Sequence, residues 1–103
     1  MNKDYSGTIP ETWRNISAVF SALGDEHRQR ILLSFEPNER LNVGQIAGIS
    51  TLARSTVSHH LKVLRDADVL IAERKGKEIY FRVNKTFLQD AFGKVSTYLD
   101  RLL

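Results

Sequence analysis

The positions of apolar and polar residues follow a helical period along most of the chain, and the two kinds separate most sharply near its centre. When residues 54–67 are wound as a helix, Val57, Leu61 and Leu64 share one side. The opposite side carries polar residues, namely Ser55, His59, Lys62 and Asp66. This pattern predicts a helix with one face packed in a core and an exposed face that donates hydrogen bonds.

A shorter helix is predicted just before the central one. Asn42 and Gln45 approximate a capping box for a helix over residues 43–49, in which Ile46 and Ala47 face inward. Residues 50–52 then form a short linker to the central helix. The two helices, over residues 43–67, match the helix-turn-helix pattern.

The amino-terminal part of the chain predicts a flexible arm and two more helices. Residues 1–7 are typical of an arm, and Pro10 with Glu11 marks a helix start. The first helix, over residues 8–23 and ending near Gly24, carries apolar residues at spacings of three, four and three: Trp13, Ile16, Phe20 and Leu23. Asp25 suits the amino-terminal cap of a second helix, which closes at the turn 36–39.

After Asp68 the apolar period changes to two, which predicts a β-hairpin over residues 71–83. Ile79, Phe81 and Val83 form one face of the second strand, and residues 75–77 form the turn. The basic residues at its tip either keep a solvated edge from aggregating or contact DNA as a wing. Because the hairpin follows the polar-faced helix, we favour the wing.

The last helix is predicted over residues 85–103, and its apolar residues repeat with the heptad spacing of a helix seam. Its apolar surface exceeds what one small domain easily covers, so a dimer interface built with the first helix is favoured over a plain core helix. The predicted interface residues are Trp13, Ile16, Phe20, Leu88, Phe92, Val95, Leu99 and Leu102.

The exposed face of the central helix favours DNA binding. Hydroxyl, imidazole and ammonium groups suit phosphate oxygens and the base edges of the major groove. An ordinary helix start explains Ser55 or Thr56 as caps, but it leaves Ser58 and the residues after it unexplained. The candidate DNA-binding residues on the helix and the hairpin are Arg54, Ser55, Thr56, Ser58, His59, Lys62, Arg74, Lys75 and Lys77.

Composition sharpens this picture. The net charge of the 103-residue chain is only +3, but residues 51–84 hold seven basic and four acidic side chains, so the whole excess lies beside the predicted recognition helix. The absence of cysteine excludes disulfides and thiolate metal sites. No apolar run approaches the roughly 18 residues of a membrane span, and the polar start is not a signal peptide. We therefore expect one domain, residues 1–103, in the cytoplasm.

The three histidines give no sign of a catalytic or metal site. His59 and His60 are adjacent, so on a helix they point about 100° apart and cannot hold one proton or metal together. His60 borders the core, and His27 has no second candidate ligand at metal spacing. We therefore expect no enzymatic activity, no bound metal and no cofactor.

The order of these elements and the sequence motifs within them resemble those of the ArsR/SmtB family of bacterial winged-helix repressors, over about residues 14–102. The similar segments are residues 22–25 with Arg28, residues 31–32, residues 41–47, residues 55–67 (STVSHHLKVLRDA) and residues 74–81. The resemblance implies a mainly α (α+β) winged helix-turn-helix with a two-stranded wing and terminal dimerisation helices. It also implies a homodimer that binds an imperfect palindrome in double-stranded DNA and represses transcription.

The chain departs from the metal-sensing members of that family. Arsenic, cadmium and lead sensors carry a Cys-Val-Cys pair at the start of the third helix, where this chain has Asn42 and Gly44. Zinc and cobalt sensors carry Asp and His ligands on the last helix, which here holds Asp90 and Asp100 but no His. The effector therefore stays open. An alternative function is a winged-helix interaction protein that is regulated by, or titrates, a protein partner through its terminal helices.

Overall fold

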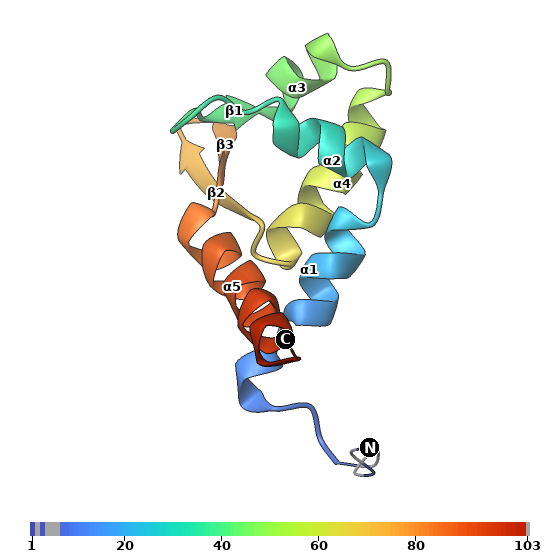
Figure 1. Cartoon of the computed structure of the whole chain (residues 1–103). Helices are drawn as coiled ribbons and strands as arrows, with labels where there is room; N and C mark the ends of the chain where they lie inside the picture. Colours follow the sequence, from blue (N-terminus) through green and yellow to red (C-terminus); the bar gives the residue numbers. More distant parts are fainter. Residues whose placement is uncertain (2, 4–6, 103) are drawn as a thin grey trace.

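The computed structural model describes residues 1, 3 and 7–102, and these form helices and a small sheet around one core (Figure 1). In chain order the elements are η1 (Glu11–Trp13), α1 (Ile16–Leu23), α2 (Glu26–Leu33), β1 (Leu41–Asn42), α3 (Val43–Ile49), α4 (Arg54–Asp66), β2 (Leu70–Lys75), β3 (Glu78–Val83) and α5 (Lys85–Leu102). This arrangement confirms the predicted winged helix-turn-helix fold. The predicted end of α5 at Leu103, and residues 2 and 4–6 of the predicted arm, lie outside the described residues.

The sheet has three antiparallel strands in the order β1-β3-β2, so the expected two-stranded hairpin gains a third strand. β1 pairs Leu41 with Phe81 and Asn42 with Tyr80, and it thereby covers an edge of β3 that a hairpin would leave open. A strand of two residues is too short to show an alternation of apolar and polar positions. The sequence pattern therefore does not predict β1.

The core lies where α1, α3, α4 and the sheet meet. Val57, Leu61 and Leu64 of α4 are almost fully buried, as the pattern of the central helix predicts. They pack in one cluster with residues from the neighbouring elements, including Val19, Ile46, Val69 and Leu70. Burial of such aliphatic side chains stabilises the fold by about 1.5–3 kcal/mol each.

The first helix differs from the prediction. Instead of one helix over residues 8–23, the chain forms the short 3₁₀ helix η1, turns, and begins α1 at Ile16. Asn15 between them has φ of 75°, a left-handed conformation that asparagine tolerates better than most residues. Its carbonyl accepts a hydrogen bond from the Val19 N–H, so Asn15 ends the 3₁₀ turn and starts α1.

The predicted helix caps are present. The Asp25 carboxylate accepts hydrogen bonds from the N–H groups of His27 and Arg28, at 2.8 and 3.2 Å. Asn42 and Gln45 form a complete capping box, with reciprocal bonds of 2.8 and 2.9 Å. These caps fix where α2 and α3 begin, and the start of α3 follows directly from β1.

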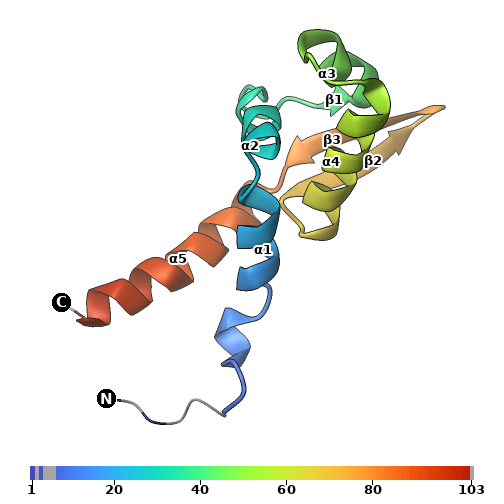
Figure 2. The same cartoon turned by 90° about the vertical axis from the view of Figure 1, so that its right-hand side faces the viewer.

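α5 projects from the rest of the molecule, as Figure 2 shows, and the extents of the chain are 52 × 24 × 23 Å. The radius of gyration of the chain is 16.2 Å, whereas a compact domain of this length has about 13 Å. Among the described residues, no helix is both long enough and apolar enough to cross a membrane.

Candidate nucleic-acid interface

The polar face of α4 is exposed to solvent. Ser55, Thr56, Ser58, His59 and Lys62 are all exposed. The amino-terminal cap of the helix is Ala53, and no side chain caps it. The explanation of the hydroxyl residues as helix caps is therefore not supported. Within the described part of the chain, their hydroxyls make no hydrogen bond, so they are available to a ligand.

His60 fixes the opposite edge of α4 to α2. Its ring is 8% exposed, and the Nη1 of Arg28 donates a hydrogen bond to its Nδ1 over 3.2 Å. Arg28 is itself held by the carbonyl oxygen of Ala22, 2.6 Å from its Nε. Because a guanidinium only donates, His60 accepts at Nδ1 and carries its proton on Nε2. His60 is thus a packed residue, as the sequence indicates, and not part of the exposed face.

Burial lowers the pKa of the His60 imidazole below its ordinary value, and the Arg28 guanidinium adds to this shift while the Asp25 carboxylate opposes it. The pKa of Asp25 is itself held low, first by the Arg28 N–H and also by the His27 N–H that it accepts. Both shifts favour the charge states that hold α2 against α4: a neutral His60 and an ionised Asp25.

Arg54 begins α4 and lies across the start of α3. A Cβ added to Gly44 would lie 3.2 Å from the Nη1 of Arg54 and 3.4 Å from the Oδ1 of Asn42. The glycine therefore leaves room for the guanidinium at the point where the two helices approach each other. This contact joins a candidate DNA-binding residue to the preceding helix.

Lys62 and Arg65 both lie beside Asp66, at 3.5 and 3.3 Å from its carboxylate oxygens. All three side chains are exposed, so these ion pairs are weak and are exchanged easily for a phosphate partner. Arg65 is not among the DNA-binding residues that the sequence predicts, because the helical period places it nearer the apolar face of α4 than Lys62.

The tip of the β2–β3 hairpin is basic and exposed. Lys75 pairs with Glu78 in the register, and the turn between them contains Gly76 at φ of 61°, a conformation that favours glycine. Among the described residues, Arg74, Lys75 and Lys77 form no ion pair. Figure 2 shows α4 and the hairpin on the side of the molecule opposite the free end of α5, with the tip pointing outward.

The middle of the hairpin holds a charge cluster that the sequence pattern does not predict. Glu73 lies between two arginines, with Arg82 at 2.7 Å and Arg40 at 3.3 Å. The hydrogen bond from Arg82 lowers the pKa of Glu73, and Arg40 adds to the effect. Arg40 precedes β1, so only the unpredicted third strand places it here.

The terminal elements carry a second exposed surface, which is apolar. Phe20, Phe92, Leu99 and Leu102 are all 44% exposed or more, and the rings of Phe20 and Phe92 lie 6.3 Å apart. Trp13 contacts Tyr98 edge to face. Leu88 and Val95 are partly buried against the core. Ile16, which the apolar spacing predicts to lie in the interface, is 6% exposed and instead belongs to the core.

Comparison with known proteins agrees with this architecture. A family model described as "Bacterial regulatory protein, arsR family" matches residues 25–71. The transcriptional repressor SdpR of Bacillus subtilis is 32% identical over 83 residues, which cover 81% of this chain and 91% of SdpR. The arsenic resistance transcriptional regulator ArsR1 of Pseudomonas putida is 33% identical, but the match covers 64% of this chain and about half, 52%, of ArsR1.

Solved structures share the fold. An ArsR-like transcriptional regulator from Rhodococcus superposes with a TM-score of 0.76 at 23% identity, over 89% of both chains. The homodimeric winged helix-turn-helix DNA-binding domain of a possible ArsR-family regulator from Mycobacterium bovis gives a TM-score of 0.68 at 23% identity, over 94% of this chain and 92% of that one.

Proposed function

Because the chain belongs to the ArsR family of bacterial regulatory proteins and is a DNA-binding transcriptional regulator, we propose that it is a homodimeric repressor that reads an imperfect palindromic operator through α4. The observation that carries the proposal is the polar face of α4, whose hydroxyls and His59 are exposed and take no part in capping. Donors placed on one helix face in this way suit base edges in the major groove. Repression is proposed from the similarity to SdpR, a repressor.

The proposed interface has two parts with different roles. Ser55, Thr56, Ser58, His59 and Lys62 contact base edges and nearby phosphates, while Arg74, Lys75 and Lys77 of the wing (residues 71–83) contact phosphates. Arg54 contributes to the helix part from its position over Gly44.

A homodimer is proposed from the exposed apolar surface of the terminal elements. The isolated chain exposes 7654 Å², about 1,800 Å² more than a typical monomer of its mass. A second copy packed on this surface, with Trp13, Phe20, Leu88, Phe92, Val95, Leu99 and Leu102 at or beside the contact, would cover part of that excess. The solved M. bovis domain, described as homodimeric, supports this assembly.

We further propose that no thiolate or histidine metal site regulates the protein. The chain has no cysteine, and no three ligand-type residues gather at metal distance within residues 1, 3 and 7–102. Gly44 instead accommodates Arg54, a role that a metal-binding residue there would disturb.

The test is to recover genomic DNA fragments on the purified protein, sequence them, and measure binding to the shared site. A palindromic site bound by two copies, with affinity that falls steeply with salt, is the expected result. Equal affinity for the recovered sites and for unrelated DNA would contradict the proposed function.

A further inference from the structure

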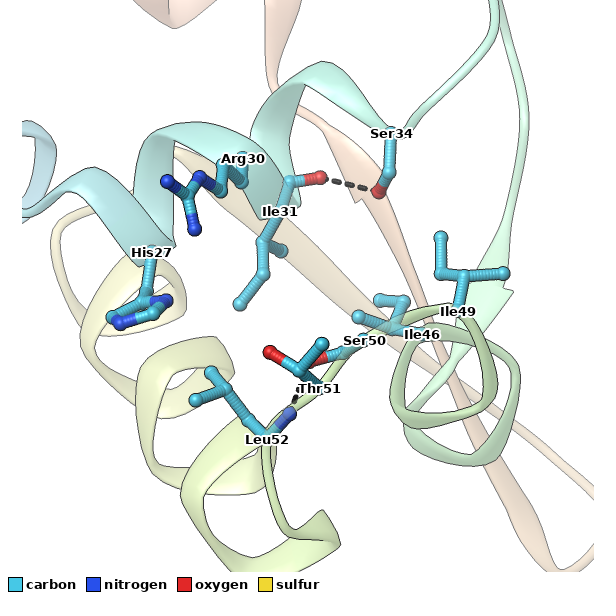
Figure 3. A pocket seen from close by; sticks show the side chains of 9 residues that line it. All are labelled: His27, Arg30, Ile31, Ser34, Ile46, Ile49, Ser50, Thr51 and Leu52. Carbon is cyan, nitrogen blue, oxygen red and sulfur yellow. Dashed lines mark hydrogen bonds between the residues drawn. The ribbon is translucent and has the colours of Figure 1, made fainter.

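A cavity of about 200 Å³ lies between α2, α3 and the linker that joins α3 to α4. Its apolar walls are formed by Ile31 of α2, Ile46 and Ile49 of α3, and Leu52 of the linker (Figure 3). An apolar cavity of about 150 Å³ in a protein core is large enough to bind benzene. This cavity therefore has room for one small ring or one short branched chain.

Polar groups surround the mouth of the cavity. The Nη2 of Arg30 lies 3.6 Å from the Oε1 of Glu26, and because both side chains are exposed this ion pair is weak. The Oγ of Ser50 accepts a hydrogen bond from the Leu52 N–H, which leaves its own hydroxyl proton free to donate. Within the described residues, the Thr51 hydroxyl forms no hydrogen bond. The mouth thus offers one cation and two hydroxyl donors beside apolar walls.

We propose that this cavity binds a small organic carboxylate, with its apolar body against Ile49 and Leu52, above the buried Ile31 and Ile46, and its carboxylate on Arg30. A guanidinium binds a carboxylate through two parallel hydrogen bonds, so the ligand replaces the weak partner Glu26. A neutral apolar molecule would leave the hydroxyls unused, and a strongly polar one would leave the exposed side chain of Ile49 uncovered. The mixed lining selects a molecule with one anionic end and one apolar end.

The second half of the inference rests on the proposed function: binding of the carboxylate weakens DNA binding. His27 lines the cavity and its ring stacks on His60 at 5.9 Å, while His60 lies 6.0 Å from His59 on the proposed DNA-binding face. The carboxylate adds one negative charge beside the linker that leads into α4, and the ligand contacts this linker directly. Both effects disfavour the approach of DNA phosphates to the start of α4. We expect about a tenfold loss of operator affinity, within the usual range of allosteric coupling.

The binding step is tested by NMR on the full chain, titrated without DNA with benzoate, phenylacetate and 3-methylbutanoate, and with uncharged benzamide as a comparison. We expect at least one acid to shift the amide signals of α2 and residues 50–52, and benzamide to shift them less. Ile49→Trp fills the mouth, and because Ile49 is 72% exposed the core is not disturbed. Arg30→Gln removes the cation, and Arg14→Gln is its matched control, since the two arginine side chains are 67% and 68% exposed and each pairs with a glutamate three or four residues before it in the chain.

The expected result is that Ile49→Trp and Arg30→Gln each weaken binding of the acid at least tenfold, while Arg14→Gln leaves it unchanged. The site is overturned if no acid shifts these signals, or if all three variants bind as the wild type does. It is also overturned if the acids do not bind and Arg30→Gln weakens binding to every DNA sequence alike, because Arg30 is then a phosphate contact.

The regulatory step is tested by fluorescence anisotropy on the recovered operator, with and without the acid that binds. Loss of operator affinity in the wild type and no loss in Ile49→Trp is the expected outcome. An acid that binds and leaves operator affinity unchanged overturns the regulation. If the acid binds and the protein prefers no DNA sequence, the proposed function fails while the binding site stands.

Discussion

His59 and His60 are neighbours in the sequence, yet they lie in opposite environments. His59 is exposed on the polar face of α4, and His60 is buried against α2 with its Nδ1 bonded to Arg28. The helical period places His60 at the edge of the core. Its partner is 32 residues away in the sequence, and no local pattern reports a contact of that range. The sequence thus predicts burial of this histidine but not what holds it.

Substitutions on the helix and on the hairpin should have different effects on DNA binding. We expect His59→Ala to cost about 1–3 kcal/mol of binding free energy and to relax base preference, because a base contact is lost. Lys77→Ala should weaken all sequences alike and reduce the slope of log affinity against log salt by about one unit per contact in each subunit. Salt titrations on specific and unrelated DNA separate the two. The same slope and the same specificity ratio for both variants would contradict the division of roles.

The buried imidazole makes the stability of the fold depend on pH. The pKa of His60 is lowered from 6.5 in the folded chain, so on acidification the unfolded chain takes up the proton first. The stabilisation is present above pH 6.5 and is lost progressively as the pH falls from there towards the folded pKa. Urea denaturation above and below this pH should show that acidification lowers the free energy of unfolding less for His60→Gln than for the wild type. His59→Gln is the control, and a loss equal to that of His60→Gln would contradict the assignment.

Among the elements, those with local signals were predicted well. The capping box of α3, the cap of α2, the turn of the hairpin and the buried stripe of α4 each depend on residues within one or two helical turns of each other. β1 depends on pairing with residues about 40 positions later, and the break at Asn15 depends on a single backbone conformation. Neither has a periodic signal, so neither was predicted.

The two glycines of α3 offer a matched pair of substitutions. Gly48→Ala meets no atom within 4 Å, so it should stabilise the chain by up to about 1 kcal/mol through helix propensity and leave DNA binding unchanged. Gly44→Ala has the same propensity gain but displaces the Arg54 guanidinium, which lies 3.2 Å from the new Cβ. We expect Gly44→Ala to weaken DNA binding, as measured by anisotropy. Equal DNA affinity in both variants would show that the position of Arg54 is unimportant.

At the scale of the whole molecule, the chain alone is extended and exposes an apolar surface on its terminal elements. The heptad spacing of α5 predicts this surface in part, since Phe92, Leu99 and Leu102 are exposed whereas Leu88 and Val95 are partly buried against the core. Periodicity does not distinguish core from interface, however, and for this reason Ile16 was assigned to the interface although α1 buries it.

Phe92→Asp should produce a monomer that no longer binds the operator. A carboxylate in an apolar interface costs several kcal/mol when it stays unpaired, and the dimer sets the half-site spacing of about 34 Å. Thr97→Asp adds the same charge to an exposed position about 140° away around α5, so it should leave the dimer intact. Sedimentation and operator binding measure both effects. A wild-type chain that is monomeric at micromolar concentration would contradict the proposed dimer.

β1 limits how the DNA operators of such a regulator can change during evolution. Because β1 is bonded to β3 and runs directly into α3, the wing and the helix-turn-helix are joined in one body, whereas in the proposed homodimer only the terminal elements join the two copies. Within each half-site, the distance between the base contacts proposed for α4 and the phosphate contacts proposed for the wing is then constant. Adding or deleting one base pair there shifts one contact by about 3.4 Å and removes it. We therefore expect the operators in a genome to vary by base substitution and to keep a fixed length in each half.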